Sequence, residues 1–199
     1  MKLGAVIIDT RCNDGLVDII KNHMKYLPNF ELNIFCNEMA SVFSKEFPQA
    51  RVFRIGFDLT INSYNKFLTN NSLWYALPYD KVVIFQADSM ILREGIEDFL
   101  HFDYIGASWS FPPYVGNGGF SVRNPTLMIE CINRVKYNSS IHGNEDVYFA
   151  NNMSGKIANI NEADKFSCET KFVLGTLGYH AIEKYLSETD CLTIKNQYK

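Results

Sequence analysis

Three carboxylates occupy positions where a catalytic site could use them. Asp88 directly follows an unbroken apolar run, and Glu145 and Asp146 are adjacent at the start of a predicted helix. A carboxylate just past a buried strand can hold a divalent cation, which a phosphorylated ligand needs. A carboxylate at the mouth of a site can remove the proton from an attacking hydroxyl. Because adjacent residues in a helical turn point in different directions, we expect only one of Glu145 and Asp146 to be a base.

Each carboxylate also has a structural interpretation. A strand-end aspartate such as Asp88 often caps the turn that follows it. Two acidic residues at a helix start are favoured by the helix dipole, which accounts for Glu145 and Asp146 without any catalysis. Taken alone, these residues leave both interpretations open.

A glycine-rich loop at residues 116–121 is another candidate. Its three glycines within four residues let the backbone approach a ligand closely and offer several N–H groups to its oxygens. The competing interpretation is a hairpin turn, because Asn-Gly is a common hairpin signal. The loop sequence alone favours the turn.

Among the four histidines, His180 has the most distinctive context, because Gly178 lets the backbone turn sharply before it. A single histidine is more often a surface residue or a core residue whose hydrogen bonds are satisfied. The context of His180 alone does not favour a functional role over that interpretation. Trp109, Phe111 and Tyr114 could stack on the face of a sugar ring, or they could pack beneath their own loop.

An α/β sheet would position these groups. Residues 82–85 are four consecutive large apolar residues, which predicts a strand buried on both faces, and residues 5–8 form a second such run. Further strands are expected at 31–36 and 51–55, alternating with helices. This order implies a parallel sheet with right-handed crossovers. In open sheets of this kind, ligands bind past the carboxyl ends of the strands, where Asp88 stands.

Helical spacing and caps complete the expected organisation. Asn13 or Asp14 can cap the first helix, and Asn124-Pro125 is a strong helix start. The residues after Cys191 are expected to be loosely held. A short strand is expected at 104–107, and helices are expected at 16–24, 40–47, 61–68, 73–77, 96–102, 124–135 and from 145.

The composition sets outer limits. The chain has 199 residues, which suits one domain with a sizeable core. A net charge of −3 gives no reason to expect a nucleic-acid binder. Five widely spaced cysteines suggest neither a zinc site nor a disulfide framework. No apolar run reaches the length of a membrane span, and the N-terminal run is too short for a signal peptide, so we expect a cytoplasmic protein.

Seven short motifs occur in order along the chain, between residue 5 and about residue 181. They are Thr10-Arg11, Phe-Gln-Ala-Asp-Ser at 85–89, Tyr-Ile-Gly-Ala-Ser-Trp at 104–109, Gly-Asn-Gly-Gly-Phe-Ser-Val-Arg at 116–123, Glu-Asp-Val-Tyr-Phe at 145–149, Phe-Ser-Cys-Glu at 166–169 and Gly-Tyr-His at 178–180. Together they resemble a small family of nucleotide-sugar glycosyltransferases with the GT-A fold. The resemblance implies one α/β domain over 1–199, with a mostly parallel sheet flanked by helices. Its nucleotide-binding half would cover about 1–90, its acceptor and catalytic half about 91–186, and its tail 187–199.

The resemblance also implies roles for the nucleotide end of the site. Thr10 and Arg11 would contact the base, the ribose or the diphosphate. Gln86, Asp88 and Ser89 stand where GT-A enzymes carry an Asp-x-Asp motif, with Gln86 in place of the first acid. Asp88 keeps the position of the metal ligand, and Gln86 can still bind a ribose hydroxyl. Lys66 is a weaker candidate for a phosphate contact.

Other residues would act on the sugar and the metal. By the same resemblance, Asn117, Gly118 and Gly119 would line the donor sugar. Asp146, or else Glu145, would be the base of an inverting transfer. His180 would complete, with Asp88, a site for Mn²⁺ or Mg²⁺.

The expected activity is therefore metal-dependent transfer of a sugar from a nucleotide-diphosphate donor to a carbohydrate acceptor. UDP-sugars are the first choice by resemblance, and dTDP and GDP donors remain open. A sugar nucleotidyltransferase would need a glycine-rich phosphate loop with a downstream lysine after the first strand. This chain has Thr10-Arg11-Cys12-Asn13-Asp14 there, which argues against that class. The alternative of another class is a non-catalytic nucleotide-sugar or glycan-binding domain, which would not need Asp146 together with the metal ligands.

Overall fold

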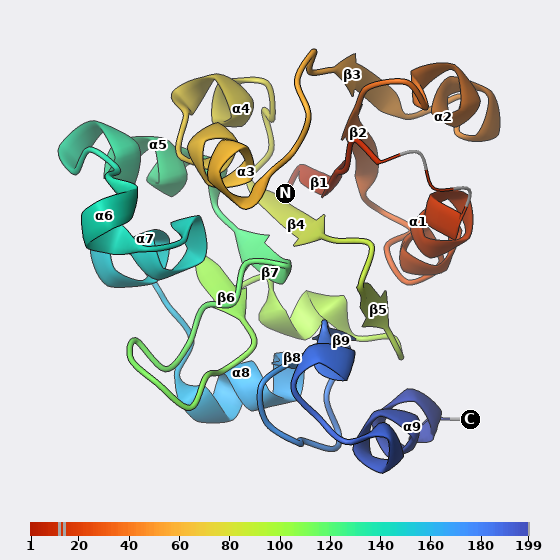
Figure 1. The fold of residues 1–199 in the computed structure, drawn as a ribbon, viewed down its shortest axis with the longest axis vertical. Coiled ribbons are helices and arrows are strands. Elements are labelled where there is room, and N and C mark those ends of the chain that lie inside the picture. The colour runs from red at the N-terminus through yellow and green to blue at the C-terminus, as the bar shows by residue number, and fades with distance from the viewer. Residues whose placement is uncertain (12, 14, 199) are drawn as a thin grey trace.

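The computed structural model describes residues 1–11, 13 and 15–198, so Cys12 and the candidate cap Asp14 lie outside the described residues. Within these residues, the central sheet has the strand order β3-β2-β1-β4-β7-β6 (Figure 1). Strands β3, β2, β1 and β4 are parallel, and β7 is antiparallel to both of its neighbours. The mostly parallel sheet is therefore confirmed. The strands are β1 (Leu3–Ile8), β2 (Glu31–Cys36), β3 (Arg51–Arg54), β4 (Lys81–Phe85), β6 (Tyr104–Gly106) and β7 (Phe120–Arg123).

Helices connect the parallel strands, because a crossover must return the chain to the same edge of the sheet. The side chain of Asn13 accepts a hydrogen bond from the N–H of Gly15 at 2.9 Å at the start of α1, and Asn124 caps α5, as predicted. The first four helices are α1 (Gly15–Lys25), α2 (Ala40–Glu46), α3 (Ile61–Leu68) and α4 (Asn71–Tyr75). After β7 come α5 (Pro125–Arg134), α6 (Ser139–His142), α7 (Glu145–Asn152) and α8 (Ile160–Phe166).

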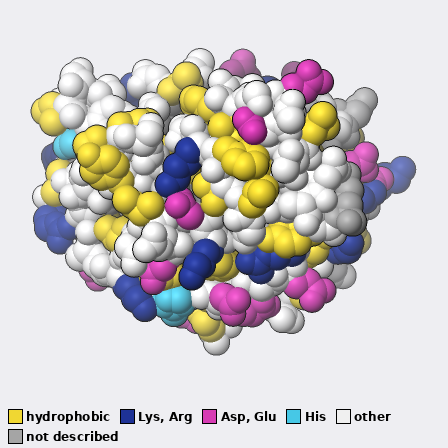
Figure 2. All heavy atoms as spheres, turned by 90° about the horizontal axis from the view of Figure 1, so that it is seen from below, with side chains coloured by type: hydrophobic (Ala, Val, Ile, Leu, Met, Phe, Trp, Pro, Cys, Tyr) yellow, Lys and Arg dark blue, Asp and Glu magenta, His cyan; other side chains and the backbone are white. Residues whose placement is uncertain are grey.

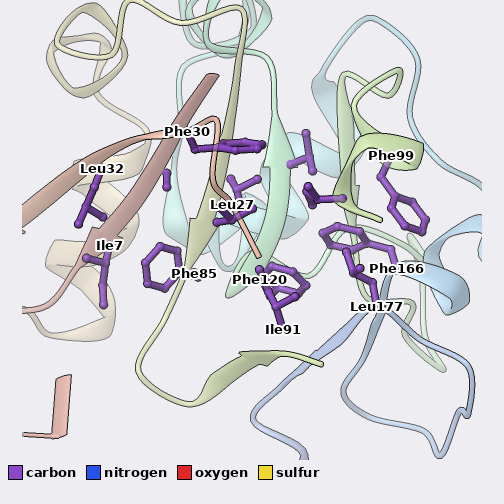
Figure 3. Close-up of a cluster of buried hydrophobic side chains, with 14 of the residues drawn as sticks. Ile7, Leu27, Phe30, Leu32, Phe85, Ile91, Phe99, Phe120, Phe166 and Leu177 are labelled. Atoms are coloured by element: carbon purple, nitrogen blue, oxygen red, sulfur yellow. The ribbon is translucent and has the colours of Figure 1, made fainter. Parts of the chain in front are cut away.

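Both faces of the sheet are buried, which explains the unbroken apolar runs. On one face, Ile7 and Phe85 belong to a core with side chains from α1, α2, α8 and the 3₁₀ helix η1 (Ile96–Phe99) (Figure 3). On the other face, Ile8 and Ile84 pack with side chains from α3, α4, α5 and α7. Alternate residues of one strand therefore enter two separate cores, and the sheet lies between two layers of helices.

A second, smaller sheet was not predicted. It has the order β5-β9-β8, formed by β5 (Ser89–Ile91), β9 (Gly178–His180) and β8 (Ser167–Cys168). Strands of two or three residues are too short to show a hydrophobic period in the sequence. Because β5 follows β4 closely and pairs with β9, the register places His180 opposite Ser89. A residue from the C-terminal part of the chain thus reaches the end of the central strand.

The C-terminal tail differs from the prediction. We expected the residues after Cys191 to be loosely held, but α9 (Glu188–Asn196) continues through them. Cys191 and Ile194 are buried in a small cluster with Tyr179 of β9. The sequence signal was weak because these two residues, spaced i and i+3, are the only buried residues of α9.

Two other segments also depart from expectation. The helix expected over 96–102 is only the 3₁₀ helix η1, which ends at Phe99. Helix α8, which is not among the helices expected from the sequence, has seven residues and a capping box between Asn159 and Glu162. That box is the sequence signal by which α8 could have been found.

The surface mixes side-chain types. On the face shown in Figure 2, basic and acidic side chains lie interspersed among apolar ones. In the part of the chain that the structure describes, no helix has the length and apolar character needed to cross a membrane. The four cysteines among the described residues are buried and unpaired.

Candidate active site

A cavity of about 430 Å³ opens beyond the carboxyl ends of β1 and β4. Its walls come from segments far apart in the chain: the residues after β1 and β4, helix α3, the loop before β7, the start of α7 and the C-terminal part. The structure thereby brings together most of the predicted site residues, namely Arg11, Gln86, Asn117, Gly118, Gly119, Glu145, Asp146 and His180.

The direction of β7 explains how the glycine-rich loop reaches this place. Strands β1 and β4 are parallel, so the residues that follow them lie at the same edge of the sheet. Strand β7 is antiparallel to β4, so the residues that precede β7 lie at that edge as well. The N–H of Gln86, after β4, donates to the carbonyl of Gly119, before β7, at 2.9 Å.

His180 lies at the centre of a group of oxygen atoms. Its Nε2 atom is 3.1 Å from Oε1 of Gln86 and 3.2 Å from Oδ1 of Asp88. On the other side of the ring, Nδ1 is 3.1 Å from Oε1 of Glu169. Residues from two strand ends and from the C-terminal part therefore meet at one imidazole.

Glu169 is a functional residue that our residue assignments missed. It is buried, and its carboxylate accepts hydrogen bonds from Nε1 of Trp109 at 2.9 Å and from Nδ2 of Asn117 at 2.8 Å. With its contact to His180, it joins three segments of the chain at and beside the cavity wall. Its only signal in the sequence was the Phe-Ser-Cys-Glu motif, to which we assigned no chemistry.

The ionisable groups around His180 shift one another's pKa values. Burial lowers the pKa of His180, but its contacts with Asp88 and Glu169 outweigh burial and raise it to about 9. Burial also opposes ionisation of Asp88, yet His180 and Lys184 hold its pKa well below the usual range. Lys184, at the end of the 3₁₀ helix η2 (Ile182–Lys184), donates to Oδ2 of Asp88 at 2.7 Å.

The donor atoms around Nε2 of His180 fit a divalent cation. Two atoms that bind one cation at right angles, each at about 2.1 Å, lie about 3 Å apart, which matches the contacts of His180 with Gln86 and Asp88. Because the pKa of His180 is about 9, both ring nitrogens carry a proton at neutral pH, so a cation at Nε2 would have to replace the proton there, while the Nδ1 proton stays shared with Glu169. Among the described residues, no group of three His, Cys, Asp or Glu side chains could hold a metal ion, and the other oxygen atom near Nε2 is the amide oxygen of Gln86.

Asp146 begins α7 at the opposite wall of the cavity. Its carboxylate accepts hydrogen bonds from the N–H of Gly118 at 3.2 Å and from the N–H of Val147 at 2.8 Å. Burial, followed by the negative charge of Glu145, raises its pKa to about 7. A carboxylate whose pKa lies near neutral pH is suited to accept a proton.

Glu145 has a different environment from its neighbour. Its two oxygens form a bidentate pair with Arg123, at 2.7 and 3.0 Å, and both side chains are buried. Its backbone N–H also donates to Oδ1 of Asn65 at 3.1 Å. Because this carboxylate is committed to a fully buried guanidinium, the structure disfavours Glu145 as the base.

The two glycines of the loop are required by close packing rather than by a hairpin turn. A Cβ atom on Gly118 would lie 2.4 Å from Oε1 of Glu145, and one on Gly119 would lie 2.2 Å from Nε2 of His180. Any side chain at these positions would displace groups of the site. The loop therefore lies against both the carboxylate pair and the histidine.

The residues after β1 form another part of the cavity wall. The guanidinium of Arg11 forms a forked pair with the carboxylate of Asp9, with Nε 2.9 Å from Oδ1. The hydrogen bond with Asp9 raises the pKa of Arg11. Arg11 is largely exposed and can reach an anionic ligand, whereas Asp9 is buried and orients it. Asp9 is a second residue that our assignments missed.

Four predicted ligand-binding residues are not part of the cavity wall. Asp88 is one of them, although its carboxylate contacts two residues of the wall, His180 and Lys184. Thr10 accepts a hydrogen bond from the N–H of Leu59 at 3.0 Å and so fixes the chain before α3. Ser89 is buried, and its hydroxyl donates to the carbonyl of Gln86 at 2.7 Å. Lys66 is exposed on α3 and is not part of the cavity wall. Thr10 and Ser89 support residues of the site and do not line it.

The aromatic loop divides into buried and exposed parts. Trp109 is buried and bonded to Glu169, and Phe111 stacks on it with ring centroids 5.4 Å apart. Phe111 and Tyr114 are each about half exposed, at 47% and 46%. The packing interpretation therefore holds for Trp109, while the other two rings remain accessible.

Comparison with known proteins supports the fold. The glycosyltransferase GlyE of Streptococcus pneumoniae TIGR4 superposes with a TM-score of 0.63 at 11% identity, over 94% of this chain and 56% of GlyE. The galactosyltransferase LgtC, in complex with donor and acceptor sugar analogues, superposes with a TM-score of 0.55 at 13% identity, over 94% of this chain and 88% of LgtC. The chain thus spans about half the length of GlyE. These likenesses show a GT-A-like fold.

The sequence comparisons place the chain in a family. No curated protein matches it significantly. One family model covers residues 45–180, from α2 to the end of β9, and thus includes His180, Glu169 and Asp146. Because this match spans more than half of the chain, the chain belongs to the family described as "Protein of unknown function (DUF5672)".

Proposed function

We propose that this protein is a glycosyltransferase that moves a sugar from a nucleotide-diphosphate donor, with UDP-sugars as the first choice, to a hydroxyl of a carbohydrate acceptor. The observation that carries the proposal is the convergence of three chemically distinct groups in one cavity. They are the cation Arg11, the donor set around His180 and the carboxylate of Asp146.

The donor set would hold Mn²⁺ or Mg²⁺ through Gln86, Asp88 and His180. When bound, the cation supplies positive charge that stabilises the departing nucleoside diphosphate. Glu169 keeps the imidazole oriented and its Nδ1 proton engaged, so that Nε2 can act as a ligand. Arg11 adds a positive charge beside the same end of the cavity and is held there by Asp9.

Asp146 would accept the proton of the attacking hydroxyl. Its pKa of about 7 leaves a large fraction ionised at neutral pH while keeping it basic enough to take a proton. Gly118 and Gly119 lie against the carboxylates of α7 and against His180, and both line the cavity where the sugar would be held. Attack from the base side on the carbon that loses the diphosphate would invert its configuration.

Two observations favour the alternative of a non-catalytic nucleotide-sugar-binding domain. Lys184 is paired with Asp88 at 2.7 Å, and Gln86 supplies no charge where a second acid would strengthen metal binding. A domain that held a diphosphate with Arg11 and Lys184 alone would not require Asp146.

A donor screen separates the two functions. The protein would be incubated with UDP-, dTDP- and GDP-linked sugars, with and without Mn²⁺, and the released nucleoside diphosphate would be measured. Turnover of one donor that depends on Mn²⁺ supports the transferase. Binding of a donor with no turnover under any condition identifies the binding domain. A protein that neither binds nor turns over any of these donors rules out both.

A further inference from the structure

The hydroxyl of Tyr64 is a polar group without a partner inside the site. Tyr64 lies on α3 and forms part of the cavity wall, and its Oη atom is buried. Among the described residues, no group meets this atom with the geometry of a hydrogen bond, although the amide of Gln86 lies close enough to lower its pKa. Of the five buried side-chain atoms left in this state in the described part of the chain, it is the one that borders this cavity. Buried polar groups are nearly always bonded, so such an exception calls for a missing partner.

Other buried tyrosines of the chain show what a structural hydroxyl does here. Tyr104 donates to the carbonyl of Gly116, and Tyr148 donates to the carbonyl of Val135. Tyr79 bonds with Glu31 and Asn33. Each of these hydroxyls ties two segments of the protein together, which Tyr64 does not do.

The surroundings of the Tyr64 hydroxyl place it at the sugar end of the cavity. The amide of Gln86 lies close to it, and the charges of Glu145 and Asp146 act on it. Both oxygens of Glu145 are occupied by Arg123, and those of Asp146 accept from backbone N–H groups. A tyrosine hydroxyl has an ordinary pKa of about 10, so at neutral pH this group carries its proton and can donate.

Helix α3 holds this hydroxyl in a fixed position relative to the carboxylates. A capping box between Thr60 and Ser63 fixes the start of the helix. The neighbouring Asn65 donates to Oδ1 of Asn144 at 3.1 Å and accepts from the N–H of Glu145 at 3.1 Å. The ring therefore does not have to be ordered when a ligand arrives, which avoids an entropic cost of binding.

We propose that the Tyr64 hydroxyl is a specificity contact that donates a hydrogen bond to a hydroxyl of the donor sugar, between Gln86 and Asp146. This inference rests on the proposed function. In the proposed function the diphosphate of the nucleotide is assigned to Arg11, another part of the same cavity wall. A donor whose sugar lacks the matching oxygen leaves a buried O–H unpaired, which is the arrangement by which polar sites discriminate most strongly.

The substitution Tyr64→Phe removes only the oxygen and keeps the ring. Binding of UDP and of UDP-glucose, UDP-galactose and UDP-N-acetylglucosamine would be measured by calorimetry with Mn²⁺. We expect the affinity for UDP to stay within about twofold, and the affinity for the recognised UDP-sugar to fall roughly 3- to 10-fold, as for loss of one hydrogen bond. The melting temperature should not fall, because no bond within the protein is lost.

Tyr79→Phe is the matched control. Its hydroxyl bonds with Glu31 and Asn33 and precedes β4, at the edge of the sheet away from the cavity. This variant should have a lower melting temperature and unchanged affinity for both ligands, which is the opposite pattern to Tyr64→Phe.

Three results would count against the contact. Wild-type affinity of Tyr64→Phe for both UDP and the UDP-sugar overturns it. An equal loss for both ligands, together with a lower melting temperature, shows a structural hydroxyl instead. If the wild-type protein binds none of the three UDP-sugars more tightly than UDP, the Tyr64 contact is refuted as well. If the protein binds no nucleotide at all, the proposed function itself is refuted.

Discussion

The imidazole of His180 separates two kinds of carboxylate. Nδ1 faces Glu169, which is buried and also bonded to Trp109 and Asn117, so this side of the ring is fixed. Nε2 faces the oxygens of Gln86 and Asp88. These short distances are favourable only when Nε2 carries a proton or when a cation lies between the three atoms. Gln86 is neutral, so Asp88 is the group on which binding of a divalent cation at this position depends most.

Asp88→Ala tests this dependence. We expect Mn²⁺ to strengthen UDP binding to the wild-type protein by at least about tenfold, and the variant to lose most of that gain, because it removes the charged ligand. Calorimetry of UDP with and without Mn²⁺ measures both values. Asp80→Ala is the control, since Asp80 is exposed and lies before β4, where it bonds with the N–H of Lys2. A wild-type affinity that is the same with and without Mn²⁺ would refute the metal assignment.

The assignment of Asp146 as the base predicts how kcat/KM depends on pH. If it is the base, it must be deprotonated to act, so kcat/KM should rise with pH and level off above its pKa of about 7. Asp146→Asn should keep donor affinity within about twofold and lose roughly 10²- to 10⁴-fold in kcat, which is the usual contribution of a general base. Donor affinity would be measured by calorimetry and turnover by release of nucleoside diphosphate. Full turnover in this variant would exclude the assignment.

At the scale of elements, the loop before β7 is what joins the two halves of the site. Gly118 lies against Glu145, Gly119 lies against His180, and the carbonyl of Gly119 is bonded to Gln86. The loop occupies this position because β7 is antiparallel to β4. A change in the loop should therefore affect different parts of the protein according to which glycine is replaced.

Gly118→Ala and Gly119→Ala form a matched pair. A methyl on Gly118 would meet the carboxylate of Glu145 and the guanidinium of Arg123, which are both buried, and disrupting such a pair costs about 3–5 kcal/mol. A methyl on Gly119 would displace His180 instead. We expect the first variant to show the larger fall in melting temperature, and the second to lose the Mn²⁺-dependent gain in UDP affinity. A Gly119→Ala protein that retains this gain would contradict the close contact with His180.

The elements that the sequence predicted well are those that are long or buried on both faces. Residues 82–85 and 5–8 have no alternation and became β4 and β1, and the caps at Asn13 and Asn124 were readable from residue type. Strands β5, β8 and β9 have two or three residues and show no period, so the small sheet was invisible. The direction of β7 depends on pairing with distant strands and was equally inaccessible.

The site was predictable to the extent that its residues end strands or begin helices. Gln86, Asp88 and Asp146 occupy such positions. Tyr64 lies inside α3, and Glu169 follows β8, a two-residue strand that the sequence does not reveal. The importance of both residues comes from what they face in the folded chain. Thr10 and Ser89 also follow strands, yet the chain turns their side chains away from the cavity, toward the backbone of Leu59 and Gln86. Residue type and position do not reveal such a local turn.

At the scale of the whole molecule, the C-terminal part supports the site from outside the central sheet. His180 ends β9, and its neighbour Tyr179 lies in a buried cluster with Ile182 and with Ile194 of α9. Lys184, which pairs with Asp88, is in η2 between β9 and α9. Helix α9 therefore bears on the position of His180 although none of its residues lines the cavity in the described part of the chain.

Ile194→Ala tests whether this support reaches the site. Ile194 is fully buried, so its truncation should lower stability by about 2–5 kcal/mol and leave a cavity beneath β9. Because segments with fewer apolar contacts open more readily, His180 should be held less firmly, and the Mn²⁺-dependent gain in UDP affinity should decrease even at temperatures where the variant is still folded. Leu192→Ala, on the same helix but 54% exposed, should change neither quantity. If Ile194→Ala lowers the melting temperature yet keeps the full Mn²⁺ effect, α9 adds stability alone and the small sheet holds His180 without it.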